Sequence, residues 1–235
     1  MTTSAAPAAM SATDARVLAA WDANAAAWTR ALREGRLPGR AAADEAILRL
    51  VRQVPTGPIL DAGCGEGWLA RELAGHRHEV MAVDGSTEML VRAEEARGVR
   101  FRRLTYAEAA EHPRRLEGPF GTIVFNFSLP GEKITPILET AGEVLFPYGR
   151  ILIQAPHPTE SSDEPYADEW REERFAETGI DFPRPQPFYF RTLATWIAEL
   201  RRARLILTEV LEPVDPETGR PVSLILSATT PERWK

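Results

Sequence analysis

Three glycines and two aspartates are the residues of this sequence whose types and spacing most suggest chemistry. The apolar run ILDA at residues 59–62 stops at GCGEG, residues 63–67, and a helical stretch follows from Trp68. Glycine lets a backbone turn sharply and approach a ligand where a β-carbon would collide. A strand, a glycine loop and a helix in this order present free backbone amides to a bound molecule. We therefore expect a ligand-binding loop here, with a tight turn that binds nothing as the alternative.

The spacing of the glycines argues against a dinucleotide as the ligand. The dinucleotide fingerprint would place its third glycine at position 68, which is Trp68, and Asp61 before the loop would repel a pyrophosphate. An ammonium group would tolerate that acid. Asp84 ends the next apolar run, where a carboxylate can accept two hydrogen bonds from a ribose diol, or can cap the helix that follows.

The order of the elements predicts the sheet that must position these residues. Short apolar runs alternate with helical stretches between residues 58 and 154, which indicates a parallel, doubly wound sheet with helices on both faces. Two runs near the end, residues 205–211 and 222–229, have no helix between them and so must pair antiparallel. We expect an α/β, Rossmann-like fold that ends in an antiparallel hairpin.

Two segments stand outside this alternation. Residues 13–52 read as two helices, and residues 155–191 are rich in proline and aromatic residues, with local helix expected around residues 164–175. We expect residues 1–12 to be a disordered tail and residues 13–235 to be one domain. Within it, residues 13–52 would form a helical lid and residues 155–191 an ordered insertion.

The motifs in this order resemble those of a known family. ILDAGCGEG, VMAVDGS, FGTIVFNFSL and LFPYGRILIQ look like the methyltransferase domain shared by class I S-adenosylmethionine-dependent enzymes. By pattern, the ubiquinone and menaquinone biosynthesis methyltransferases are the nearest well-known relatives. The resemblance covers roughly residues 56–155. The final hairpin matches the family's seven-stranded sheet, and WDANAAAW resembles the aromatic segment that precedes the domain in such enzymes.

The resemblance implies a set of cofactor contacts at the ends of three strands. They are Asp61, Gly63, Gly65, Asn126 and Phe127 for the methionine part, and Asp84, Gly85, Ser86 and Met89 for the ribose and adenine. The family often has an aspartate after the third strand to bind adenine, but LTYA stands there instead. We therefore expect Thr105, Tyr106 or the backbone to take that role.

Aromatic and basic residues of the N-terminal helices are further candidates. Trp21 and Trp28 share one helix face, which is most often a core position, but Trp28 could instead lie near the cofactor's sulfonium. A cation over an aromatic ring gains about 0.5–2 kcal/mol. Arg40, or Arg33, could pair with the methionine carboxylate through its two-pronged guanidinium, if it is not simply solvated.

His157 follows the fifth strand, at the edge where ligands bind in doubly wound sheets. We predict it as the general base, with ordering of its own loop as the equally weighted alternative. The aromatic insertion offers Tyr166, Trp170, Phe188 and Tyr189 as acceptor-binding residues. No histidine or cysteine spacing indicates a zinc site, so we expect no metal.

Composition limits the other possibilities. Among 235 residues there is one cysteine, the formal net charge is −6, and no apolar run reaches the ~20 residues of a membrane helix. We expect a cytoplasmic monomer or homodimer that binds neither nucleic acid nor membranes. The expected reaction is methyl transfer from S-adenosylmethionine to an oxygen, nitrogen or carbon of a small molecule, as in secondary metabolism. The alternatives are a non-catalytic binding protein and a nucleotide-dependent oxidoreductase.

Overall fold

The computed structural model describes residues 10–54, 57–74, 78–93, 95–158 and 164–231. Its centre is a seven-stranded sheet in the order β3-β2-β1-β4-β5-β9-β8, and a separate two-stranded sheet pairs β6 with β7. The strands are β1 (Ile59–Ala62), β2 (Val80–Asp84), β3 (Val99–Arg103), β4 (Phe120–Asn126), β5 (Leu145–Ala155), β6 (Glu169–Glu173), β7 (Gln186–Phe190), β8 (Ile206–Leu211) and β9 (Leu224–Thr229).

The helices alternate with the first five strands and then recur once before β8. They are α1 (Ala12–Arg33), α2 (Arg40–Arg52), α3 (Trp68–Ala74), α4 (Thr87–Arg92), α5 (Tyr106–Glu111), α6 (Thr135–Glu143) and α7 (Leu193–Arg202), with short 3-10 turns η1 (Pro113–Leu116) and η2 (Ala176–Thr178). The first five strands run parallel, whereas β9 pairs antiparallel with both β5 and β8. The predicted Rossmann-like fold with a final hairpin is confirmed. No helix in the described ranges combines the length and apolarity needed to cross a bilayer.

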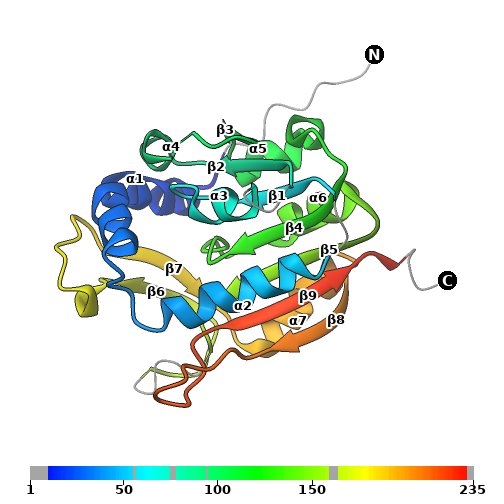
Figure 1. Ribbon diagram of the computed structural model, residues 1–235. Coiled ribbons are helices and arrows are strands. Elements are labelled where there is room, and N and C mark those ends of the chain that lie inside the picture. Colours follow the sequence, from blue (N-terminus) through cyan, green and yellow to red (C-terminus); the bar gives the residue numbers. More distant parts are fainter. Residues whose placement is uncertain (1–9, 55–56, 75–77, 94, 159–163, 232–235) are drawn as a thin grey trace.

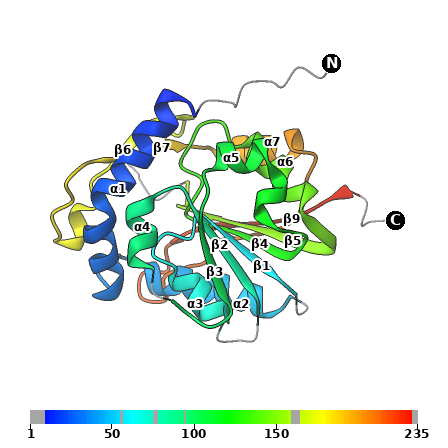
Figure 2. The same ribbon diagram turned by 90° about the horizontal axis from the view of Figure 1, so that it is seen from above.

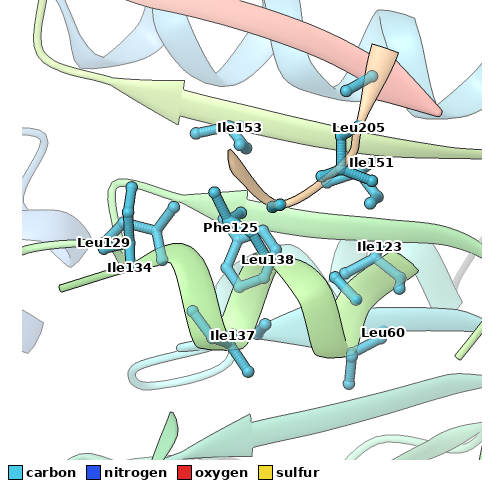
Figure 3. Close-up of a cluster of buried hydrophobic side chains, with 14 of the residues drawn as sticks. Leu60, Ile123, Phe125, Leu129, Ile134, Ile137, Leu138, Ile151, Ile153 and Leu205 are labelled. Atoms are coloured by element: carbon cyan, nitrogen blue, oxygen red, sulfur yellow. The ribbon is translucent and has the colours of Figure 1, made fainter. Parts of the chain in front are cut away.

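Each face of the central sheet has its own buried apolar layer. Figure 2 shows α2 and α3 on one face, and α5, α6 and α7 on the other. The larger layer packs Phe125 and Ile153 of the sheet against Leu138 of α6 (Figure 3). The other layer packs Ile47 of α2 and Leu69 of α3 against the opposite side of the same strands. Central strands buried on both faces explain the continuous apolar runs in the sequence.

Helix α1 and the β6–β7 hairpin lie together on one side of the molecule, away from β8 and β9 (Figure 1). Asn24 of α1 is fully buried, and its carboxamide makes two hydrogen bonds to the backbone of Arg184, of 2.9 and 3.1 Å. Gln186 donates a hydrogen bond to the Val17 carbonyl at 3.4 Å, and Arg16 pairs with Glu172 at 2.7 Å. We call α1 together with residues 164–191 the lid.

The structure corrects three expectations about the elements. The segment around residues 164–175 is not helical, because its chain pairs as β6 with β7, Trp170 opposite Tyr189. The sequence predicts a helix over residues 133–146, but α6 ends at Glu143, since Leu145 already pairs with Phe120 of β4. Of the predicted tail, residues 1–9 lie outside the described residues, while Ser11 caps α1 through the Asp14 backbone N–H and Ala12 is helical.

Candidate active site

A cavity of about 620 Å³ lies at the carboxyl ends of the parallel strands, with α1 along one wall. Asp61 of β1, Asp84 of β2 and Asn126 of β4 reach it from neighbouring strands. Ligands bind at this edge in doubly wound sheets, because the loops after parallel strands meet there. All of the predicted cofactor residues except Ser86 and Arg33 line this cavity. Their contacts with a cofactor remain predictions.

The glycine loop shows two different reasons for glycine. A β-carbon on Gly63 would lie 2.4 Å from Cβ of Ser128 and 2.6 Å from the Tyr106 hydroxyl, so Gly63 is needed for packing. A β-carbon on Gly65 would meet nothing within 4 Å, and Gly65 lines the cavity. Both have positive φ, of +74° and +57°. Gly65 thus leaves open a space beside the loop that a bound molecule can fill.

Asp84 is held at the centre of this loop region by backbone amides. Gly65 donates to one carboxylate oxygen at 2.8 Å and Ser86 to the other at 2.7 Å. Burial raises the pKa of Asp84, opposed by these hydrogen bonds. Each carboxylate oxygen has a second lone pair, so the group can still accept from a ribose diol in the cavity.

Asp61 is a buried acid with an incomplete set of partners. It is 1% exposed, and its Oδ2 has no hydrogen-bond partner. Burial raises the pKa of Asp61 to about 7, and the nearby charge of Asp84 adds to the rise. A buried carboxylate oxygen without a donor is costly, and a ligand ammonium would satisfy it. The donor set therefore fits the amino group of a methionine moiety.

Asn126 ends β4 and Phe127 follows it, and both line the same cavity. Asn126 Oδ1 is buried without a partner, and Phe127 has a φ of +53°, a strained conformation for a residue with a side chain. The Arg40 guanidinium lies 5.1 Å from the centres of both the Phe127 and the Trp68 rings. Arg40 also pairs with Asp44 at 2.6 Å, and burial lowers the pKa of Arg40. This partly buried cation is a group available to a ligand carboxylate.

The side chains of Thr105 and Tyr106 follow β3. Methyltransferases often have an adenine-binding aspartate in this region, and this chain does not. Thr105 caps α5 by accepting from the Glu108 backbone N–H, and Glu108 accepts in return from the Thr105 N–H. The Tyr106 hydroxyl lies 3.0 Å from the carbonyls of both Ala62 and Ser128. It thereby ties α5 to the glycine loop and to the β4–α6 loop. Burial raises the pKa of Tyr106 well above its usual value.

Trp21 and Trp28 line the cavity and also reach the rest of the lid. Their rings meet edge to face at 5.2 Å, and Phe175 lies 6.3 Å from Trp21 and 5.3 Å from Trp28. Phe182 stacks on Phe175 at 4.6 Å. Both tryptophans are half-buried and belong to neither buried layer of the sheet, so the core prediction is wrong. They line the cavity, and a position of Trp28 near the sulfonium remains a prediction.

The far end of the cavity was missed by sequence reasoning. Its walls come from the start of α1, the C-terminal end of α5 and the start of α6. The lining there is mostly apolar and carries three charged side chains, Asp14, Glu111 and Lys133. Asp14 lies close to Gly131, whose β-carbon would be 3.0 Å from an Asp14 oxygen. The sequence does not show this end of the cavity, because it forms only when contacts with residues far away in the chain place α1.

Several predicted residues lie elsewhere. Ser86 is fully buried behind the lining, and His157 is 6% exposed, with Nε2 2.8 Å from Glu212 beyond β8. Neither lines the cavity, so the geometry gives His157 no access to an acceptor there. Tyr166, Trp170, Phe188 and Tyr189 lie on or beside the β6–β7 hairpin and also stay outside the lining. Trp170 packs on Tyr189, and Tyr166 on Phe190. The described part of the insertion packs against α1, and none of its residues lines the cavity.

No triplet of His, Cys, Asp and Glu side chains in the described part of the chain is grouped to hold a metal ion.

Comparison with known proteins identifies the domain. Residues 59–149 match the family model described as a methyltransferase domain. No curated protein sequence matches the chain significantly. Among solved structures, an S-adenosylmethionine-dependent methyltransferase from Mesorhizobium loti is 22% identical, with a TM-score of 0.58, and the match covers 79% of this chain and 97% of that one.

Two further structures carry ligands. The 1,6-didemethyltoxoflavin N1-methyltransferase of Burkholderia thailandensis, with its substrate and S-adenosylhomocysteine, is 23% identical, with a TM-score of 0.59 and coverage of 96% of this chain and 93% of that one. The glycopeptide N-methyltransferase MtfA in complex with S-adenosylmethionine is 18% identical, with a TM-score of 0.60 and coverage of 80% and 87%.

Residues 59–149 therefore carry a methyltransferase domain, and the chain has the Rossmann-like fold seen in S-adenosylmethionine-dependent methyltransferases of known structure. Its closer kinship with the ubiquinone and menaquinone enzymes remains a prediction.

Proposed function

We propose that the cavity binds S-adenosylmethionine and that the enzyme methylates a small, uncharged or cationic acceptor at a nitrogen atom. The observation that carries the cofactor proposal is the open space at Gly65 between Asp61 and Asp84. Asp84 would hold the ribose, Asp61 the ammonium and Arg40 the carboxylate. Thr105 and Tyr106 would lie beside the adenine.

The residues of this chain mainly align the acceptor and exclude water. When bound, S-adenosylmethionine supplies a methyl group on a positively charged sulfur, and a well-aligned lone pair can displace that sulfur. Alignment and exclusion of water account for much of the acceleration of such a reaction. Trp21 and Trp28 form an apolar wall whose ring faces suit a positive sulfur.

Charge supports the choice of acceptor. The lining contains the carboxylates of Asp14 and Glu111 at the far end, in addition to the acids of the cofactor loop, whereas its cations are Arg40 and Lys133. Such a lining repels a phosphate or carboxylate and accepts an amine. The described part of the lining includes no histidine, which suits an amine, because its lone pair needs no strong base once neutral. The N-methyltransferase activities named for the Burkholderia enzyme and for MtfA point the same way.

Calorimetry with S-adenosylhomocysteine tests the cofactor site. Wild type should bind, and Asp84→Ala should bind at least tenfold more weakly, because hydrogen bonds to a charged group contribute about 1.5–3 kcal/mol each. Glu217→Ala, in an exposed turn, serves as the control and should bind as wild type does. Equal affinity of a folded Asp84→Ala protein would remove the ribose assignment.

A panel of acceptors tests the second half of the proposal. Aromatic amines, their phosphorylated derivatives and matched phenols would be incubated with S-adenosylmethionine, with product read by mass. We expect turnover of amines alone, and Asp14→Asn together with Glu111→Gln should reduce discrimination against the anionic derivatives. Preferred methylation of phenols or phosphorylated compounds would contradict the proposed acceptor class.

Two other outcomes would favour a different function. A copurified nicotinamide or flavin nucleotide would favour an oxidoreductase. Binding of S-adenosylhomocysteine without turnover of any acceptor would favour a non-catalytic binding protein. A role in secondary metabolism remains a prediction.

A further inference from the structure

Asp22, in the middle of α1, makes the polar contacts that join the lid to the loop after β2. Its Oδ1 accepts a hydrogen bond from the Ser86 hydroxyl at 2.6 Å and another from the Glu88 backbone N–H at 3.3 Å. Asp22 is not among the residues that line the cavity. Its carboxylate therefore acts on a neighbouring residue and does not contact a bound molecule.

Ser86 is the residue through which Asp22 reaches the cofactor site. Its backbone N–H donates to Asp84 at 2.7 Å, and its hydroxyl oxygen accepts from the Met89 N–H at 3.1 Å. Ser86 is fully buried. One residue thus holds the ribose-binding carboxylate through its backbone N–H, and caps α4 and donates to Asp22 through its hydroxyl, so a displacement of the residue disturbs all three contacts.

The other side of α1 is fastened to the rest of the lid. Asn24, two positions after Asp22, holds the Arg184 backbone, and Trp21, one position before, packs against Phe175. A displacement of Asp22 therefore moves residues of the insertion that have no contact with Ser86. Helix rigidity over one turn is sufficient to transmit this movement.

The placement of Asp22 near Asp84 is informative because their charges repel, and Asp22 contributes to the raised pKa of Asp84. A like charge beside a ligand-binding carboxylate disfavours its ionised form and raises its affinity for protons, so charge alone gives no reason for an acid here. The hydrogen bonds that Asp22 accepts from Ser86 and Glu88 do give a reason for an acid at this position. An asparagine would keep an oxygen for both donors and lose only the charge.

We propose that Asp22 is a positioning residue that couples closure of the lid to the orientation of Asp84, so that the cofactor is bound firmly only when the lid is docked. This inference rests on the proposed function of the cavity. It assigns Asp22 to cofactor binding through Ser86, and it makes the lid and the ribose site one cooperative unit.

The test compares Asp22→Ala with Asp22→Asn in the full chain, by calorimetry with S-adenosylhomocysteine and by hydrogen exchange with and without it. Asp22→Ala should bind about tenfold more weakly, and the insertion, residues 164–191, should lose its ligand-induced protection. Asp22→Asn should stay within about threefold of wild type in affinity and keep the protection. Arg16→Ala removes an exposed contact of α1 to the insertion without touching Ser86, and should bind as wild type does.

Each outcome decides the proposal. Unchanged affinity and protection in Asp22→Ala overturn it, as does an equal loss in the alanine and asparagine variants, which would assign the effect to charge. If Asp22→Ala does not fold, Ser86→Ala removes the same donor and should reproduce both losses; wild-type behaviour of that variant would overturn the coupling. If wild type itself does not bind S-adenosylhomocysteine, it is the proposed function that fails. A wild type that binds without protecting the insertion overturns the coupling alone.

Discussion

The two walls of the cavity are built by contacts of very different range. On the cofactor side, Asp84 is held by Ser86, two residues away, and by Gly65, 19 residues away. On the lid side, α1 is held by Glu172, Arg184 and Gln186, at separations of 156, 160 and 169 residues. The first wall is therefore a local property of strand, turn and helix, whereas the second exists only once the whole domain has folded.

The sharpest way to test the local wall is to fill the space at Gly65. Gly65→Val should lose binding of S-adenosylhomocysteine by about 100-fold or more, because the side chain would occupy the cavity that the cofactor needs. Its positive φ also adds a strain of about 1 kcal/mol or more. Calorimetry and circular dichroism would separate the two effects.

Gly219 provides a matched control for Gly65. It has a φ of +67°, its β-carbon would also meet nothing within 4 Å, and it lies in a turn outside the cavity lining. Gly219→Val should show a similar loss of stability with unchanged affinity. Similar affinities for the two valine variants would mean that the glycine loop is only a turn.

Loosening the distant wall should have a smaller effect on binding and a larger one on dynamics. Asn24→Ala leaves the Arg184 N–H and carbonyl without their partner, which costs about 1–3 kcal/mol of lid docking. We expect faster hydrogen exchange throughout α1 and the insertion, while β1 to β4 exchange as in wild type. Exchange that rises uniformly in all elements would show that the two walls are not separable.

The pH dependence of stability probes a single buried acid of the local wall. The pKa of Asp61 is about 7 in the folded protein and near 3.8 in the unfolded chain, so the folded state binds the additional proton between these values. Stability should therefore fall as pH rises from about 4 to about 7, by about 1.4 kcal/mol per unit at most, and then level off. Asp61→Asn should flatten this fall in thermal unfolding measured across that range. A slope equal to that of wild type would contradict the raised pKa of this buried, incompletely hydrogen-bonded acid.

His157 gives the smallest expected effect. A lost general base costs about 10²-fold or more in turnover. Because His157 pairs with Glu212 outside the cavity lining, we expect His157→Ala to retain turnover within about threefold and to lose some thermal stability. A loss of 100-fold or more with unchanged cofactor affinity would restore His157 as the base and would require this loop to move.

What the sequence could predict follows the same division. The ends of β1, β2 and β4 were predicted with their site residues, since periodicity, glycines and terminal acids are visible within short windows. The β6–β7 hairpin was predicted as partly helical, because nothing near Trp170 indicates that Tyr189 is its partner. The far end of the cavity was missed for the same reason: Asp14 and Glu111 are ordinary surface acids until α1 brings them to one space. His157 was placed by an edge-of-sheet rule that does not specify which way its ring turns.

The distance between Asn24 and Arg184 along the chain also has a consequence during synthesis. At about 5–20 residues per second, a ribosome needs roughly 8–32 s to add the 160 residues that separate them. A helix forms within about a microsecond, so α1 exists long before its partner does. During that interval Trp21 and Trp28 have neither Phe175 nor Phe182 to cover them. The nascent protein thus exposes the apolar face of an amphipathic helix for most of its time on the ribosome. We therefore expect α1 to be the segment that a chaperone binds.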